Sequence, residues 1–171
     1  MLEKLIIATG NQGKYKEFNY LAETYGENFA EEIIFAPSIA DLIVEETGKT
    51  YAENAMLKAR AWAEKSGLPC LADDSGLEVE ALNGAPGLYS ARVAPDNKIE
   101  WLLNQLAGVE NHRAKFVASL ALCVPNEYIL ICEGECCGRI TDSPRGSNGF
   151  GYDPVFVPDN FESNCPILHR S

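Results

Sequence analysis

The spacing of apolar residues divides the first part of the chain into alternating strands and helices. Residues 4–9 form a short apolar run, which predicts a strand, and residues 33–36 predict a second one. Between them, residues 14–25 place apolar side chains at helical spacing on one face. The stretch "GNQGK" separates the first strand from this helix and predicts a tight turn.

A second helix is predicted from the end of "EETGKTYAEN", with signals at both of its ends. Thr50 is placed to cap the N-terminus, and Glu53 stands three residues later, which is the spacing of a capping box. Alanines then recur at helical spacing until Gly67, where we expect the helix to end.

The second half of the chain predicts one more helix and several strands. "LPCLADDSGLEVEAL" has the pattern of a strand, a tight turn and another strand, and "APDNKIEWLLNQLAG" predicts a helix. "RAKFVASLALCV" and "EYILICEGECCGRI" predict two strands joined at "PNE", and the first is apolar on both faces, as a central strand is. Strand–helix units followed by a hairpin predict an α/β fold with a mixed sheet. A length of 171 residues suits a single domain with two lobes.

Composition and charge narrow the class of protein. A net charge of −11 argues against a duplex nucleic acid as partner, because binding phosphates requires a basic face. The charge is compatible with a nucleotide, since a metal ion can bridge carboxylates to phosphates. No apolar run approaches the about 20 residues of a membrane span, and no signal peptide is recognisable. The six cysteines include no Cys-x-x-Cys pair, so we expect free, mostly buried thiols in a cytoplasmic protein.

The first candidate for chemistry is "ATGNQGK", residues 8–14. Its two glycines allow backbone N–H groups to face a phosphate, the helix N-terminus favours negative charge, and Lys14 is long enough to reach phosphate oxygens. The glycines are closer together than in a Walker A loop. The alternative is a plain strand-to-helix turn capped by Thr9 or Asn11.

Two clusters of carboxylates form the second candidate. In "ADDSG", Asp73 and Asp74 have the oxygen donors that magnesium prefers, and a carboxylate there could also orient a water molecule. The alternative is a turn in which Asp74 hydrogen-bonds its own backbone. In "EETGKTYAEN", Glu45 and Glu46 precede the turn and suit a metal role, whereas a carboxylate at a helix N-terminus stabilises the helix in any case.

The stretch "GSNGFGYDP" is the third candidate. Its glycines surround Phe150 and Tyr152, and an aromatic ring beside flexible backbone can stack on a nucleobase. Asp153 can accept hydrogen bonds from a base or a sugar, and the alternative is a plain turn. A phosphate-type loop, two carboxylate clusters and an aromatic glycine loop together favour a magnesium-dependent enzyme that acts on a nucleotide.

Four stretches carry a resemblance to a known family. "IIATGNQGKYKEF", "EETGKTYAENAMLKA", "LADDSGLEVEALNGAPGLYSAR" and "GFGYDPVF" follow one another in the order found in the inosine triphosphate pyrophosphatases, the XTP/dITP diphosphatases. The resemblance covers residues 1 to about 158. It implies a long mixed sheet flanked by helices, two lobes with a nucleotide cleft between them, and a homodimer. The implied reaction is magnesium-dependent hydrolysis of non-standard purine nucleoside triphosphates, such as ITP, dITP and XTP, to the monophosphate and pyrophosphate.

The resemblance also implies roles for individual residues. The triphosphate loop corresponds to Thr9, Gly10, Asn11 and Lys14, with Lys14 on the phosphates. Asp74 corresponds to a metal ligand that also serves as general base, Glu45 to a second magnesium ligand, and Ser75 to a residue of the substrate site. The loop that holds base and sugar corresponds to Phe150, Gly151, Tyr152 and Asp153.

The C-terminal segment departs from the family pattern. Family members continue through a segment with a substrate-site lysine and then a Ser-His-Arg motif that recognises the base. Residues 161–171 contain no lysine, and Leu168 stands where the serine is expected, followed by His169 and Arg170. Either a deletion has drawn the genuine pair forward, or the tail is unrelated sequence, as after a frameshift.

Three functions are therefore weighed. The first is the pyrophosphatase, with His169 and Arg170 assigned to base recognition. The second is a nucleotide-binding module whose catalysis is lost or weakened because the tail is altered. The third is a related pyrophosphatase that acts on pyrimidine nucleotides.

Overall fold

The structure is a computed structural model that describes residues 2–25, 30–94, 96–146 and 149–159. His169, Arg170 and the rest of the tail after Asp159 lie outside the described residues. The helices and strands run in the order β1 (Leu2–Ile7), α1 (Gln12–Tyr25), β2 (Ala30–Phe35), α2 (Tyr51–Ser66), β3 (Cys70–Val79), α3 (Lys98–Gln105), β4 (Arg113–Val124), β5 (Tyr128–Ile140) and β6 (Phe156–Pro158).

The strands form one mixed six-stranded sheet in the order β2-β1-β3-β4-β5-β6. β1 pairs in parallel with both β2 and β3, and β5 pairs antiparallel with β6. The predicted α/β class and mixed sheet are confirmed, and β4 is a central strand, as its apolar pattern predicted. Among the described residues, no helix combines the length and apolarity that crossing a bilayer requires.

The chain divides into two compact units that are not continuous in sequence. Unit 1 contains Met1–Asp74 and Ser119–Glu133, and unit 2 contains Ser75–Ala118 and Gly134–Ser171. The chain therefore crosses between the two units three times. The crossings lie within β3, β4 and β5.

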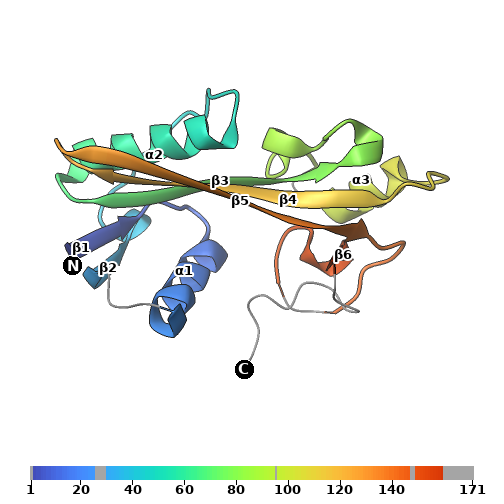
Figure 1. The fold of residues 1–171 in the computed structure, drawn as a ribbon, viewed down its shortest axis with the longest axis horizontal. Coiled ribbons are helices and arrows are strands. Elements are labelled where there is room, and N and C mark those ends of the chain that lie inside the picture. The colour runs from blue at the N-terminus through green and yellow to red at the C-terminus, as the bar shows by residue number, and fades with distance from the viewer. Residues whose placement is uncertain (1, 26–29, 95, 147–148, 160–171) are drawn as a thin grey trace. The chain divides into compact units, whose positions relative to one another are not determined.

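Unit 1 has a core of small and medium-sized side chains. Ala55, Ala59 and Trp62 of α2 pack with Ile6 of β1 and Cys70 of β3 in one buried cluster. α1 lies on the opposite side of these strands from α2 (Figure 1). The alanine-rich face of α2 allows this helix to lie close to the strands. Polar side chains of α2 can therefore reach residues of β3.

The ends of α2 follow the sequence signals. The Thr50 hydroxyl accepts a hydrogen bond from the backbone N–H of Glu53 at 3.1 Å, and the Glu53 carboxylate accepts one from the N–H of Lys49 at 2.5 Å. Gly67 adopts a left-handed conformation with a φ of 72°, which ends the helix. The predicted cap and the predicted end are both confirmed.

Unit 2 is built around larger side chains. Leu77 and Val79 of β3, Leu102 of α3, Tyr152 and Phe156 belong to one buried cluster. The ring of Phe156 also lies edge-on to that of Phe116, with 4.7 Å between the ring centroids. Aromatic burial of this kind anchors the segment that follows the 149–153 loop.

One local prediction is wrong. No turn interrupts residues 70–79: β3 is continuous, and Asp73 and Asp74 lie in its interior. Aspartate, serine and glycine favour turns when only local interactions act. Here side chains from other elements pair with the two carboxylates. This pairing allows the strand to continue through Asp73 and Asp74.

The described cysteines are all free, but they are less buried than the sequence predicted. Cys70 and Cys123 are buried, and burial raises the pKa of the Cys70 thiol to about 12. Cys132 and Cys137, on β5, are exposed. The prediction of mostly buried thiols therefore holds for the core of unit 1 and fails along β5.

Two glycines of β5 provide a test of packing in unit 2. A Cβ at Gly138 would lie 2.3 Å from the carbonyl oxygen of Val157 and 2.7 Å from the ring of Phe156, whereas a Cβ at Gly134 would have nothing within 4 Å. We expect Gly138→Ala to lower the free energy of unfolding by about 1–3 kcal/mol, because overpacking forces backbone and ring to shift. Gly134→Ala is the matched control, and equal denaturation midpoints for the two variants would contradict the close packing of β6 on β5.

Candidate phosphate and metal site

The loop between β1 and α1 is closed by its own side chains. The Thr9 hydroxyl accepts a hydrogen bond from the N–H of Asn11 at 3.1 Å. The side-chain oxygen of Asn11 accepts from the N–H groups of Gly13 at 2.8 Å and Lys14 at 3.4 Å. Asn11 therefore caps α1, as one sequence alternative predicted, and a phosphate bound by these N–H groups must displace or share this cap.

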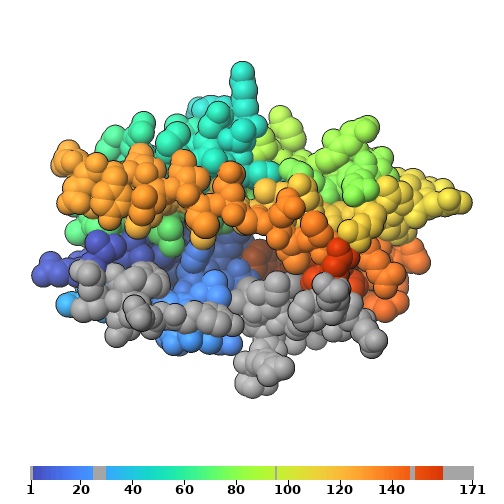
Figure 2. Space-filling model, viewed as in Figure 1, coloured from blue at the N-terminus to red at the C-terminus, as the bar shows by residue number. Residues whose placement is uncertain are grey.

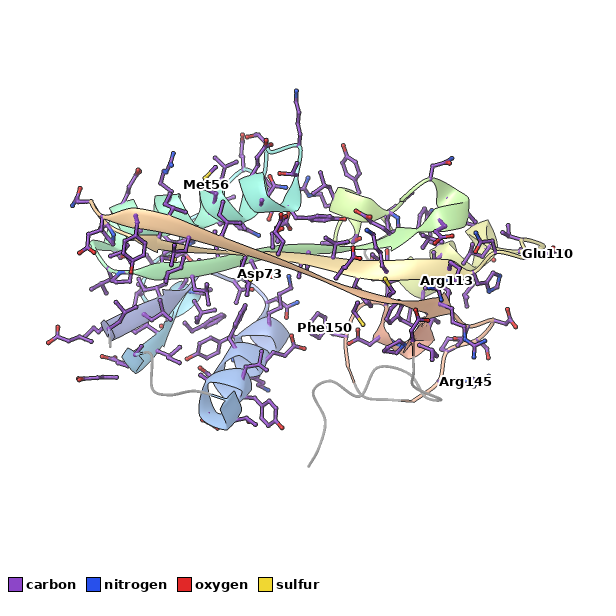
Figure 3. The ribbon with its side chains drawn as sticks, in the orientation of Figure 1. Met56, Asp73, Glu110, Arg113, Arg145 and Phe150 are labelled. Atoms are coloured by element: carbon purple, nitrogen blue, oxygen red, sulfur yellow. The ribbon has the colours of Figure 1, made fainter. Side chains whose placement is uncertain are left out.

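Lys14 ties the start of α1 to the middle of β3. Its ammonium group donates to Oδ2 of Asp73, a buried carboxylate whose side chain is 9 % exposed. Figure 3 shows Asp73 on β3. A carboxylate is seldom buried without a partner, because the charge loses its hydration. The lysine assigned to phosphates is thus also the counter-ion of an interior aspartate.

Asp74 is surrounded by side chains from α2 and the loop before it. Asn54 donates from Nδ2 to Oδ2 of Asp74 at 2.9 Å, and the ammonium of Lys58 lies 3.9 Å from Oδ1. Lys58 also forms an ion pair with Glu46 at 2.7 Å. Burial raises the pKa of the Asp74 carboxyl; the hydrogen bond from Asn54 and the charge of Lys58 oppose this rise, and Glu46 adds to it.

The two glutamates of "EETGK" have different surroundings. Glu46 is half-buried and belongs to the cluster around Lys58, whereas Glu45 is exposed. The backbone carbonyl of Glu45 accepts a hydrogen bond from the N–H of Thr47 at 3.1 Å. The structure thus brings Glu46, rather than Glu45, to Asp74, and the assignment of Glu45 as a magnesium ligand stays a prediction.

The acidic donors fit a particular kind of metal site. No group of three or more His, Cys, Asp or Glu that could hold a metal ion occurs in the described part of the chain. Magnesium is usually held by one or two carboxylates together with waters and substrate phosphates. Asp74 and Glu46, which share Lys58 as neighbour, supply donors of that kind. The residues present therefore suit a magnesium ion that phosphates help to hold.

The aromatic glycine loop belongs to unit 2 and presents a single ring. The carboxylate of Asp153 accepts from the N–H of Phe150 at 2.8 Å, and Gly149 and Gly151 adopt left-handed conformations with φ of 92° and 63°. Phe150 is 38 % exposed, and Figure 3 labels it. Tyr152 is only 3 % exposed, and burial raises the pKa of its hydroxyl to about 12. Of the two rings predicted to stack on a base, Phe150 is therefore the accessible one.

The remaining assigned residues are placed as follows. Gly10 is exposed in the loop between β1 and α1, and Ser75, the next residue of β3 after Asp74, is half-buried. Asn54 and Lys58 did not emerge from the sequence as site residues. The signal that could have found them is their spacing of four residues on α2, which places two polar side chains on one turn of a helix whose other inward positions are mostly alanine.

Solved structures of known proteins share this fold. The chain is similar to the Ham1 protein of Staphylococcus aureus, with 38 % identity, a TM-score of 0.80, and coverage of 98 % of this chain and 87 % of that one. A HAM1 protein from Coxiella burnetii has 39 % identity, a TM-score of 0.77, and coverage of 91 % and 81 %. The fold is thus that of an α/β protein of the Ham1 type.

Sequence comparison gives the same result. The Ham1 family profile matches residues 5–166. The dITP/XTP pyrophosphatase of Prochlorococcus marinus (strain MIT 9313) is 49 % identical over 160 residues, covering 91 % of this chain and 75 % of the relative. That of Haemophilus influenzae is 48 % identical over 165 residues, covering 91 % and 83 %. The chain belongs to the Ham1 family, which confirms the family resemblance.

The pair of Lys14 and Asp73 is expected to stabilise unit 1 as well as the site. Lys14→Met should lower the free energy of unfolding by about 1–3 kcal/mol, because it leaves a buried carboxylate without its charged partner. Lys4→Met is the matched control: it breaks an exposed pair with Glu32, and such pairs contribute under about 1 kcal/mol. Urea denaturation measures both, and equal small effects would contradict the proposed dependence of Asp73 on Lys14.

Proposed function

We propose that the protein hydrolyses non-standard purine nucleoside triphosphates, ITP, dITP and XTP, to the monophosphate and pyrophosphate. Two neighbouring observations carry the proposal: Lys14, at the start of α1, pairs with Asp73, and Lys58 lies beside Asp74, the next residue of β3. Both occur in a member of a family with dITP/XTP pyrophosphatases. Two ammonium groups paired with carboxylates at consecutive positions of β3 suit a reaction in which a phosphoryl group is attacked by water.

Three residues of the chain have separate roles in the proposed reaction. Lys14 binds phosphate oxygens and offsets the charge that grows on the departing pyrophosphate. Asp74 orients the attacking water toward the α-phosphorus and accepts its proton. Lys58 lies between Asp74 and Glu46 and limits the repulsion between the carboxylates and the incoming triphosphate.

Magnesium is the proposed cofactor. Asp74 would hold it, together with Glu45 as the resemblance implies or Glu46 as the geometry favours. When bound, the ion neutralises phosphate charge and acidifies water. A carboxylate is a weak base, and burial, which raises the pKa of Asp74, makes it a stronger one. Acidification of the water would make proton transfer to Asp74 easier still.

Base recognition is assigned to two parts of the chain. Phe150 offers a ring for stacking, and Asp153, which already accepts from the N–H of Phe150, shapes the loop that presents it. His169 and Arg170 remain the predicted donors to the 6-oxo group of the purine. A site built to hydrogen-bond this group rejects adenine strongly, because the wrong base leaves buried groups unpaired.

Product analysis tests the proposal. Incubation with dITP, XTP, ATP and dTTP in magnesium should yield monophosphate and pyrophosphate from dITP and XTP, and a chelator should abolish the reaction. Asp74→Asn should lower the rate about 10²–10³-fold, because the amide cannot accept the water proton. Asp142→Asn is the matched control, since Asp142 is 94 % exposed and lies in unit 2.

Three outcomes would count against the proposal. Binding of every nucleotide without turnover would favour the alternative of a module without catalysis. Release of orthophosphate would move the cleavage position away from the α-phosphorus. Preferential turnover of dTTP would favour the pyrimidine enzyme.

We also propose a homodimer, acting in the cytoplasm on the nucleotide pool. Tyr128, Leu130 and Ile131 are 47–56 % exposed at the start of β5, and this part of the strand lies uncovered on the face shown in Figure 2. Large exposed apolar side chains that gather on one strand are a common sign of an association surface.

Light scattering tests the dimer. Tyr128→Glu combined with Leu130→Glu should convert the dimer to a monomer, because these two side chains share one face of β5 and two charges on each copy would be buried in the contact. Ile43→Glu is the control, since Ile43 is 94 % exposed in a loop of the same unit. A wild-type protein that is monomeric at micromolar concentration would refute the dimer.

A further inference from the structure

Asn54 is the most deeply buried polar side chain of α2, and no step of the proposed reaction uses it. It is 2 % exposed and lies in the first turns of the helix, just after the capping residues. Burial of an amide is unfavourable unless its donors and acceptor are used. The side chain is therefore held in place by the groups around it.

Both ends of the Asn54 amide have specific partners. Its oxygen accepts a hydrogen bond from the backbone N–H of Gly48 at 2.8 Å, and its nitrogen donates to Oδ2 of Asp74 at 2.9 Å. Because an N–H can only donate and a carboxylate can only accept, these two contacts fix the orientation of the amide. An asparagine meets both demands at once, whereas an aspartate would meet only one.

The contact with Gly48 is also sterically close. A Cβ on Gly48 would lie 2.6 Å from the side-chain oxygen of Asn54 and 2.7 Å from the Cβ of Glu53. Only a residue without a side chain allows the loop to approach the helix this closely. The loop that carries Glu45 and Glu46 is thereby fastened to the same side chain that holds Asp74.

We propose that Asn54 is a positioning residue: it holds the Asp74 carboxylate by Oδ2, so that Oδ1 is directed toward Lys58, and it fixes the acidic loop relative to this carboxylate. The proposal rests on the proposed function, in which Asp74 orients water and binds magnesium. Partners of a metal-binding carboxylate commonly contribute 10–100-fold to activity or affinity.

The variant Asn54→Asp separates the two contacts of the amide. The new carboxylate keeps the shape of the side chain and the acceptor for Gly48, but it loses the donor and places a like charge against Asp74. Asn111→Asp is the matched control, because Asn111 also donates to a carboxylate, Glu80 at 3.1 Å, and accepts from a backbone N–H, that of Arg113 at 2.9 Å, at an exposed position in unit 2.

Steady-state kinetics on dITP and equilibrium binding of its α,β-methylene analogue give the first readout. For Asn54→Asp, we expect kcat to fall about 10–100-fold while the analogue binds within about threefold of wild type, the sign of a lost catalytic interaction rather than lost binding. Asn111→Asp should match wild type in both. An unchanged kcat would overturn the proposal, and so would parallel losses of kcat, analogue binding and folding stability, which indicate a merely structural role.

A swapped pair gives a readout that does not depend on activity. Combining Asn54→Asp with Asp74→Asn exchanges donor and acceptor and rebuilds the hydrogen bond, so its thermal midpoint should recover most of what Asn54→Asp alone loses. No recovery would overturn the proposed contact. If wild type hydrolyses none of the nucleotides, the proposed function fails, and the recovery in the swapped pair still decides whether Asn54 holds Asp74.

Discussion

Unit 1 has to accommodate two adjacent carboxylates in the interior of β3, Asp73 buried and Asp74 half-buried. A buried carboxylate destabilises a fold unless a cation or a hydrogen-bond donor compensates for its lost hydration. Asp73 has Lys14 from α1, and Asp74 has Asn54 and Lys58 from α2. The two helices are thus linked through charge to neighbouring residues of one strand, and the alanine face of α2 allows the approach that these contacts need.

The balance of these charges bears on how the proposed acidic site could accept a triphosphate. Asp73, Asp74 and Glu46 provide three carboxylates, while Lys14 and Lys58 provide two ammonium groups. This small excess of negative charge would favour the divalent cation proposed as cofactor. A divalent ion held by Asp74 would turn the balance positive, and Lys14 and Lys58 could then contact phosphate oxygens at little electrostatic cost.

Local signals made most of the fold predictable, and contacts distant in sequence account for what was not. The cap at Thr50, the end of α2 at Gly67 and the β4–β5 hairpin depend on near neighbours, and all are confirmed. The turn predicted at "ADDSG" is absent because Lys14, 59 residues away, stabilises Asp73 within a strand. Asn54 and Lys58 were missed for the same reason: their helical spacing places both on one turn of α2, but only the distant residue Asp74 shows what they contact.

The interleaving of the two units has a consequence for how this protein can be divided. Ala121 and Cys123 of β4 belong to the core of unit 1. In the chain they are separated from the first part of unit 1 by residues 75–118, 44 residues that belong to unit 2. A chain cut after Asp74 would therefore lack part of its own core. Neither unit is continuous in the chain, so neither can be produced or exchanged as an independent module by cutting the chain at one point.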